Sequence, residues 1–240
     1  MENAIEHFDY LATSPTAYVQ QIACGWVRNG YCFYVQGEVP SGKNPLALDE
    51  KFLERYPIRM KSSRRHSRKR RGVLNVAYLR CGRHWILLAT PGRHEETREG
   101  WLDWRALEAA SIRNCRRGQP IVAFGYSISY VRGGYVPNRE KRDPTGTAER
   151  DRKHRVRVQI SRSALARLRG YFLANALRRD EAWFSDRFWR IPFEPYAPVR
   201  KQLLELLRQV NAVRNRAGLS KISTDAIRYQ RYLVKVFESA

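Results

Sequence analysis

The sequence has no apolar run near the length that crosses a membrane. A spanning α-helix needs about 20 consecutive apolar residues, and no stretch of this 240-residue chain approaches that length. The first residues, MENAIEHFDYLATS, carry acids where a secretory signal would have a basic start and an apolar core. The sequence therefore predicts a cytoplasmic protein with no membrane partner.

Cysteine and the common cofactor motifs are also scarce. The four cysteines form no CxxC pair and have no regularly spaced histidine partners, which argues against a zinc ribbon or a disulfide framework. The chain lacks a GxxxxGK[ST] loop, a GxGxxG turn and a GxSxG elbow. We therefore expect reduced thiols, no metal site and no cofactor, with Mg²⁺ needed only if the protein is a nuclease.

Acidic residues are few beside basic ones. Asp and Glu number 23 against 45 Lys and Arg, a formal net charge of +22. With 43% hydrophobic residues the chain is expected to fold compactly. In a compact fold the many positive side chains repel one another, which lowers stability unless an anionic partner binds. Of the basic residues 36 are Arg, whose guanidinium group forks onto phosphates and stacks on bases. This composition predicts a polyanionic partner, namely nucleic acid.

The basic charge is most concentrated in MKSSRRHSRKRRG, which spans Met60 to Gly72 and contains seven Lys or Arg and no acid. The run has no apolar period, so we expect a basic loop over 59–72. A second basic cluster spans 150–157. Because both clusters adjoin strands of the predicted sheet, they are expected to grip a phosphate backbone from two sides.

Strand and helix patterns alternate over residues 30–134. Residues 73–80 and 84–90 are apolar stretches joined by a short glycine-containing connection, which predicts a β-hairpin. The other expected elements are strand 30–39, helix 46–57, helix 102–118 and strand 119–134. The order βαββαβ predicts an α+β, ferredoxin-like sheet with both helices on one face and the other face open.

Downstream of this sheet the sequence predicts an added strand and a helical C-terminal region. Residues 155–160 alternate strictly between polar and apolar and are expected to pair with 121–131. Helical periods follow from 161 and over 199–217. The expected organisation is an N-terminal helical segment 1–29, a core 30–136, a basic linker 137–154 and a basic region 155–240.

Aromatic residues on the predicted strands suggest stacking on unpaired bases. Phe33-Tyr34-Val35-Gln36-Gly37 and Arg83-His84-Trp85-Ile86-Leu87 occupy the places of the two signature strands of the RNA-recognition motif, which residues 30–131 resemble in element order. The resemblance implies base stacking by Tyr34 and Trp85 on an open sheet.

A nuclease is the main alternative. The same element order occurs in tyrosine transposases, and that resemblance implies roles for His84 on a middle strand and Tyr171 as nucleophile, although the paired histidine of their metal site is missing. A metal-free RNA endonuclease needs only a general base among cations, for which His84 or His154 would serve. A double-stranded DNA-binding protein is a further alternative.

The sequence thus favours a binding protein for structured or single-stranded RNA, preferred over DNA, acting as a subunit of a ribonucleoprotein with protein partners or of a mobile element. The expected binding residues are Arg64, Arg65, Arg68, Lys69, Arg70, Arg71, Arg152, Lys153, Arg155, Arg157, Arg167 and Arg169, with Tyr34 and Trp85.

Overall fold

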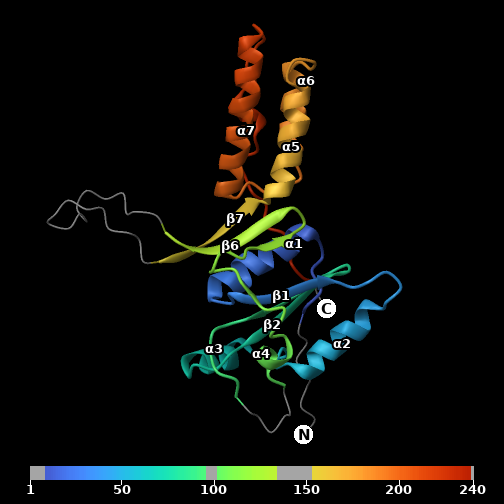
Figure 1. The fold of residues 1–240 in the computed structure, drawn as a ribbon, viewed down its shortest axis with the longest axis vertical. Helices are drawn as coiled ribbons and strands as arrows, with labels where there is room; N and C mark the ends of the chain where they lie inside the picture. Colours follow the sequence, from blue (N-terminus) through green and yellow to red (C-terminus); the bar gives the residue numbers. More distant parts are fainter. Residues whose placement is uncertain (1–8, 96–101, 134–152, 239–240) are drawn as a thin grey trace, which may run out of the picture. The chain divides into compact units, whose positions relative to one another are not determined.

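The computed structural model describes residues 9–95, 102–133 and 153–238 (Figure 1). It is a mixed α/β structure with antiparallel sheets, and the chain divides into two compact units. Unit 1 comprises residues 1–121, 129–156 and 235–240, and unit 2 comprises 122–128 and 157–234. Most of the expected linker 137–154 lies outside the described residues.

Unit 1 is built on a four-stranded sheet with the strand order β2-β3-β1-β4. β2 (Val76–Cys81) and β3 (His84–Ala89) form the predicted hairpin, with Gly82 in the left-handed region at φ 58°. β1 (Phe33–Glu38) lies antiparallel to β3, and β4 (Arg113–Asn114) pairs with β1 only at Phe33 and Tyr34.

One face of this sheet packs on two helices, one that follows β1 and one that follows β3 in the chain. Phe52 and Tyr56 of α2 (Pro45–Arg55) and Trp104 of α4 (Trp104–Leu107) are each at most 4% exposed. They form one apolar cluster with side chains from three strands: Val35, Val76, Tyr78, Leu87 and Ala89. Alternate residues of a strand point to the same face of the sheet, so these five side chains belong to one face.

The opposite face of the sheet is covered as well, contrary to the expected open face. Tyr34, Leu79 and Leu88, which alternate with the residues of the first face, are all 0% exposed. α1 (Pro15–Gln20) packs on β2, and a π-helical turn (Gln21–Trp26) and a 3₁₀ turn (Val27–Asn29) continue it. Ser14 caps α1 by accepting a hydrogen bond from the Ala17 amide at 3.1 Å. The sheet is therefore a buried middle layer.

Two elements of unit 1 differ from the sequence prediction. The basic run expected as a loop forms helix α3 (Ser62–Arg70), because Arg and Lys are good helix formers even without an apolar period. The helix expected over 102–118 is restricted to the single turn α4, and Asp103 caps it by accepting from the Arg105 amide at 2.9 Å. The chain then turns into β4, where pairing with β1 overrides helix propensity.

A buried ion pair ties α2 to the sheet of unit 1. The Asp49 carboxylate is 1% exposed and accepts hydrogen bonds from Arg80 Nε at 2.8 Å, Arg80 Nη2 at 2.6 Å and Tyr78 Oη at 2.6 Å. Both charges are thus paired and hydrogen-bonded, the condition under which burying them is tolerated.

The single strand expected over 119–134 is divided. β5 (Ile121–Ala123) and β6 (Tyr126–Arg132) flank a turn at Phe124 and Gly125, whose φ angles are 49° and 79°. β7 (His154–Ile160) completes a second sheet with the order β5-β6-β7, so the expected pairing of 155–160 with 121–131 is confirmed. β6 and β7 contribute residues to both units.

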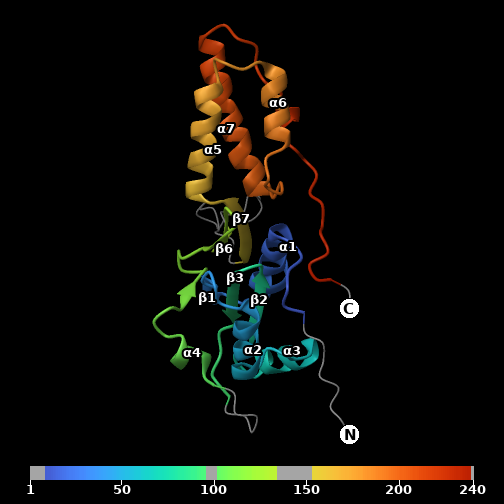
Figure 2. The ribbon, with the colours of Figure 1, turned by 90° about the vertical axis from the view of Figure 1, so that its right-hand side faces the viewer.

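Unit 2 contains the predicted helical region. Its helices are α5 (Arg162–Asn175), α6 (Glu181–Trp189) and α7 (Ala197–Arg216), of which α5 and α7 pack on each other (Figures 1 and 2). Phe172, Phe184 and Phe188 are at most 1% exposed, and the rings of Phe172 and Phe188 stack at 4.2 Å. A short 3₁₀ turn (Thr224–Ala226) precedes an extended C-terminal segment.

One cation lies inside unit 2. Arg214, near the end of α7, is 2% exposed. Its Nη1 donates to the carbonyls of Ala176 at 3.1 Å and Arg179 at 2.7 Å, just beyond α5, and its Nε donates to Ser220 O at 2.8 Å. The guanidinium also lies 5.4 Å from the Phe184 ring centroid. Carbonyl dipoles and a ring face thus replace water around this charge.

Buried tyrosines should make the fold sensitive to alkali. Burial raises the pKa of Tyr126 to about 12, and its hydroxyl accepts a hydrogen bond from the Glu194 amide at 2.7 Å. A pKa raised by folding means that the neutral form is favoured in the native state, so this contribution is complete below pH 10 and lost as the pH rises toward 12. The stability measured by urea denaturation should fall by about 1 kcal/mol between pH 9 and pH 11 from Tyr126 alone. Tyr126→Phe should reduce this pH dependence; an unchanged dependence in the variant would contradict the assignment.

Candidate nucleic-acid interface

The basic helix α3 has an inner side that fixes it to unit 1. Arg68 is 3% exposed, donates to Leu74 O at 3.1 Å and pairs with Glu95 at 2.8 Å. Arg65 donates to Met60 O at 3.0 Å and to Ile58 O, and its guanidinium lies 5.1 Å from the Trp26 ring centroid. These two residues, predicted to bind phosphate, instead anchor the helix.

The remaining cations of the predicted set lie on α3 and at its C-cap. Arg64, Lys69, Arg70 and Arg71 are exposed. Lys69 donates to Asn29 O at 2.8 Å, and Arg71 pairs with Glu95 at 3.0 Å while 57% of its side chain stays accessible. The helix therefore holds four charged heads at the surface on a fixed backbone, in place of a solvated loop.

A second basic cluster in unit 1 surrounds the start of β7. Arg116 Nε donates to His154 Nε2 at 2.9 Å, and the Tyr130 ring lies 5.3 Å from the His154 ring. Partial burial, together with the charges of Arg116 and Arg132, lowers the pKa of His154. Lys153 and Arg155 flank it and are exposed. His154, Lys153 and Arg155 are among the residues that the sequence indicates, whereas Arg116 and Arg132, which come from other segments, are not.

The two aromatic residues predicted to stack on bases differ in exposure, Tyr34 being buried and Trp85 partly buried. Tyr34 is fully buried, and its hydroxyl donates to Pro120 O at 2.8 Å. Trp85 is partly buried, packs 5.2 Å from the Phe52 ring, and has its indole edge against Gly37, where an added Cβ would come within 2.8 Å of it. The structure thus places the Tyr34 ring inside unit 1, with its hydroxyl directed at the segment before β5.

Exposed aromatic rings occur instead near the C-terminus of unit 2. Tyr229 is 80% and Tyr232 is 63% exposed. Arg200 lies 5.2 Å from the Tyr229 ring centroid, and Arg231 lies 4.6 Å from that of Tyr196. Proteins that bind single-stranded nucleic acids combine arginine with exposed aromatic rings in this way. The pattern RYQRY over 228–232 is the sequence signal for this pairing of arginine with tyrosine.

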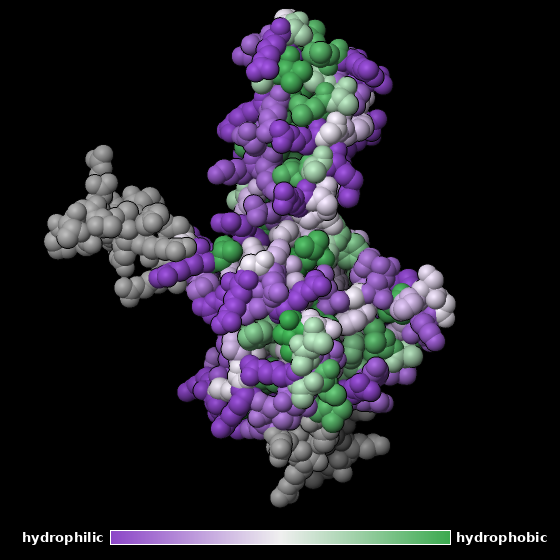
Figure 3. All heavy atoms as spheres, in the orientation of Figure 1, coloured by the Kyte–Doolittle hydropathy of each residue, from purple (hydrophilic) through white to green (hydrophobic). Residues whose placement is uncertain are grey.

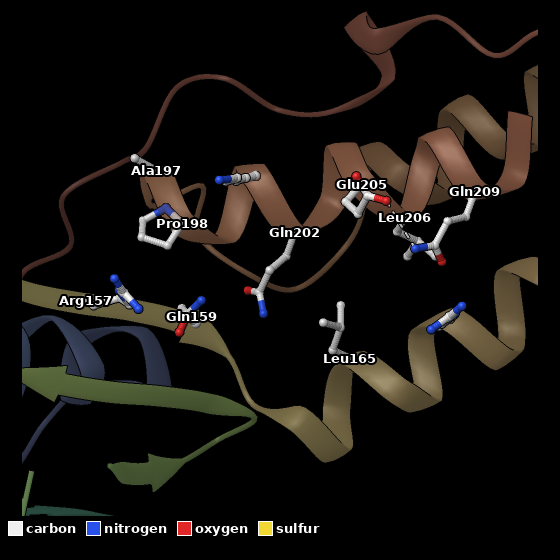
Figure 4. A pocket seen from close by; sticks show the side chains of 11 residues that line it. Arg157, Gln159, Leu165, Ala197, Pro198, Gln202, Glu205, Leu206 and Gln209 are labelled. Atoms are coloured by element: carbon white, nitrogen blue, oxygen red, sulfur yellow. Dashed lines mark hydrogen bonds between the residues drawn. The ribbon is translucent and has the colours of Figure 1, made fainter. Parts of the chain in front are cut away.

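The basic residues predicted on β7 and α5 separate in unit 2. Arg157 and Arg169 line one groove with residues of α7 (Figure 4), whereas Arg167 is exposed and is not part of its lining. Arg152 lies outside the described residues. Hydrophilic side chains cover much of the visible face of this unit (Figure 3).

The predicted catalytic residues belong to different units of the chain. His84 begins β3 in unit 1 and lies 3.9 Å from the Glu38 carboxylate. Tyr171 of α5 is in unit 2, 47% exposed, with its ring 5.9 Å from that of Trp183. Among residues 9–95, 102–133 and 153–238, no group of three or more His, Cys, Asp or Glu could hold a metal ion. All four cysteines are free.

None of the helices that the structure describes is long and apolar enough to cross a membrane. The chain matches no protein-family model, and no curated protein or solved structure gives a significant match.

Proposed function

We propose that the protein binds nucleic acid through the exposed cations of unit 1, with RNA as the preferred ligand. One observation carries the proposal: Arg65 and Arg68 anchor α3, so Arg64, Lys69, Arg70 and Arg71 are exposed on a preformed helix. A rigid array loses less side-chain and backbone entropy on binding than a flexible tail does. The net charge of +22 supports a polyanion as the partner.

RNA is proposed over DNA because the accessible aromatic side chains accompany arginine. Tyr229 and Tyr232 are exposed, with Arg200 on the Tyr229 ring. Such pairs favour unstacked bases, which structured and single-stranded RNA offers. We further propose a cytoplasmic protein that acts as a subunit of a ribonucleoprotein or a mobile element.

We also propose a ferredoxin-like arrangement for unit 1. The strand order β2-β3-β1-β4 with antiparallel neighbours supports it, since it is the order a split βαβ sheet takes. In this arrangement β4 is reduced to two residues, and α1 occupies the face that such sheets use for base stacking.

The proposal predicts a salt-dependent affinity that α3 controls. Replacing Arg64, Lys69, Arg70 and Arg71 with Ser should weaken RNA binding and lower the log-log salt slope by about 3, since each lost phosphate contact removes about 0.7–0.9. Affinity should be measured by fluorescence anisotropy at several NaCl concentrations.

A matched variant separates this array from net charge. Lys43 before α2, Lys51 and Arg55 of α2, and Arg216 of α7 are exposed, and their replacement by Ser removes the same charge. This control should change the slope by less than 1. Equal slopes for the two variants would refute a dedicated role for α3.

A second candidate activity, metal-free RNA cleavage, is favoured by the contacts of His154. The lowered pKa favours the neutral imidazole, and its Nε2, which accepts from Arg116 in this structure, would take the proton once the Arg116 guanidinium moves onto the substrate phosphate. The ribose 2′-oxygen would bond to the adjacent phosphorus as its proton moves to His154, and the P–O5′ bond would break, with water protonating the 5′-oxygen. Analysis of the RNA recovered from binding samples that contain EDTA distinguishes binding from cleavage. Intact RNA would show that the protein binds RNA without cutting it. Products with 2′,3′-cyclic phosphate ends that are absent with His154→Ala would identify an endonuclease.

A further inference from the structure

Unit 2 contains a groove of about 660 Å³ between β7, α5 and α7 (Figure 4). Two of its walls, β7 and α5, are consecutive in the chain, and the third, α7, follows after α6. The groove falls within the range of about 300–1,000 Å³ that is usual for ligand pockets. The lining consists of Arg157, Gln159, Leu165, Arg169, Ala197, Pro198, Lys201, Gln202, Glu205, Leu206 and Gln209.

The groove carries positive charge from all three of its elements. Arg157 lies on β7, Arg169 on α5 and Lys201 on α7, and all three are exposed. The one carboxylate in the lining, Glu205, is engaged by Arg208 at 3.1 Å. Three cations therefore converge on one cavity whose acid is already neutralised, which favours an anionic ligand.

Between these charges the lining also has four apolar residues. Leu165 and Leu206 face each other from α5 and α7, and Ala197 and Pro198 close one end (Figure 4). Apolar side chains beside cations suit a ligand that has flat, weakly polar rings as well as phosphates, as a nucleotide does. A simple inorganic anion would leave the apolar part unused.

The walls of the groove are fixed before any ligand binds. The Gln202 side chain donates to Ile160 O at 3.1 Å and accepts from Ile160 N at 2.8 Å, which ties α7 to the end of β7. These contacts fix the positions of β7 and α7 around the groove. A groove of this size suits an unpaired nucleotide, whereas a base inside a duplex would first have to be unpaired and unstacked, which costs free energy.

We propose that this groove binds an unpaired segment of RNA, with a base against Leu165 and Leu206 and the flanking phosphates at Arg157, Arg169 and Lys201. The proposal rests on the proposed function and adds selectivity to it: α3 would bind phosphates of any strand, whereas this groove would select single strands.

The test compares a single-stranded 12-nucleotide RNA of mixed sequence with the same sequence as a duplex. The double variant Arg169→Gln, Lys201→Gln should lose about 10- to 100-fold in affinity for the single strand and less than about 3-fold for the duplex. The matched control Arg178→Gln, Arg216→Gln removes two exposed charges from the same region outside the groove and should leave the ratio of the two affinities unchanged.

A second variant tests the cavity without changing charge. Leu165→Trp should fill the groove and lower the single-strand affinity alone, provided that its circular dichroism spectrum and thermal midpoint match those of the wild-type protein. Unchanged single-strand affinity in Arg169→Gln, Lys201→Gln, or an equal loss for both ligands, would overturn the groove assignment while leaving nucleic-acid binding in place. If the wild-type protein binds neither RNA, the proposed function itself fails and the groove assignment fails with it.

Discussion

Asp49→Ala is expected to lower the free energy of unfolding by about 3–5 kcal/mol, the usual cost of leaving one partner of a buried ion pair without the other. The variant would leave the Arg80 side chain, only 8% exposed, without its carboxylate. Because a domain's whole stability is about 5–15 kcal/mol, unit 1 would lose a large part of its margin. Urea denaturation of the full chain, followed by circular dichroism, measures the loss.

Two controls make the Asp49 result specific. Asp186→Ala removes a carboxylate that is 44% exposed and pairs with Arg190 at 2.6 Å, and it should cost less than about 1 kcal/mol. The double variant Asp49→Ala, Arg80→Met should be more stable than Asp49→Ala, since both buried charges are then gone. If Asp49→Ala cost no more than Asp186→Ala, the network would not hold α2 to the sheet.

Arg214→Met is expected to destabilise unit 2 by about 3 kcal/mol or more. The change would remove the donor from three carbonyl groups, those of Ala176, Arg179 and Ser220. A buried polar group left without a partner costs about 1–3 kcal/mol, and the methionine side chain restores only the apolar packing on Phe184. Thermal and urea unfolding report the loss.

The fork of the guanidinium group should matter as well as its charge. Arg214→Lys keeps the charge but offers a single compact amine, so the loss should lie between that of Arg214→Met and wild type. Arg208→Met provides the exposed control on the same helix, with a side chain 73% accessible, and should stay within about 0.5 kcal/mol of wild type. Equal stability of Arg214→Met and Arg208→Met would contradict the role assigned to Arg214.

The elements that were predicted correctly are those whose signal is local. The hairpin of β2 and β3 has a short glycine connection between apolar runs, and α7 has a strong apolar period, so neighbouring residues suffice to define them. The helix predicted over 102–118 was wrong because pairing of Arg113 and Asn114 with β1 decides the structure there. A basic run without an apolar period gave no sign that Arg65 and Arg68 would turn inward.

The candidate sites were predictable only in part, for the same reason. Composition indicated an anionic partner and named Arg157 and Arg169, but their meeting with Lys201 depends on how β7, α5 and α7 pack. Similarly, Arg116 reaches His154 across 38 positions of sequence. Arg214 resembles any other basic residue of α7 in the sequence, and only the carbonyls around it distinguish it from the exposed Arg208.

The cover that α1 provides for the sheet has a consequence for anyone who divides this chain into fragments. A fragment that began at β1 would expose one whole face of the sheet, including Leu79, Ile86 and Leu88, each fully buried in the intact protein. Contiguous apolar surface of this kind drives self-association. The fragment would also lose the backbone hydrogen bonds of residues 10–12 with Arg80 of β2, which would leave the edge of that strand open to other chains. Residues 9–29 thus act as the built-in protection of unit 1 against aggregation.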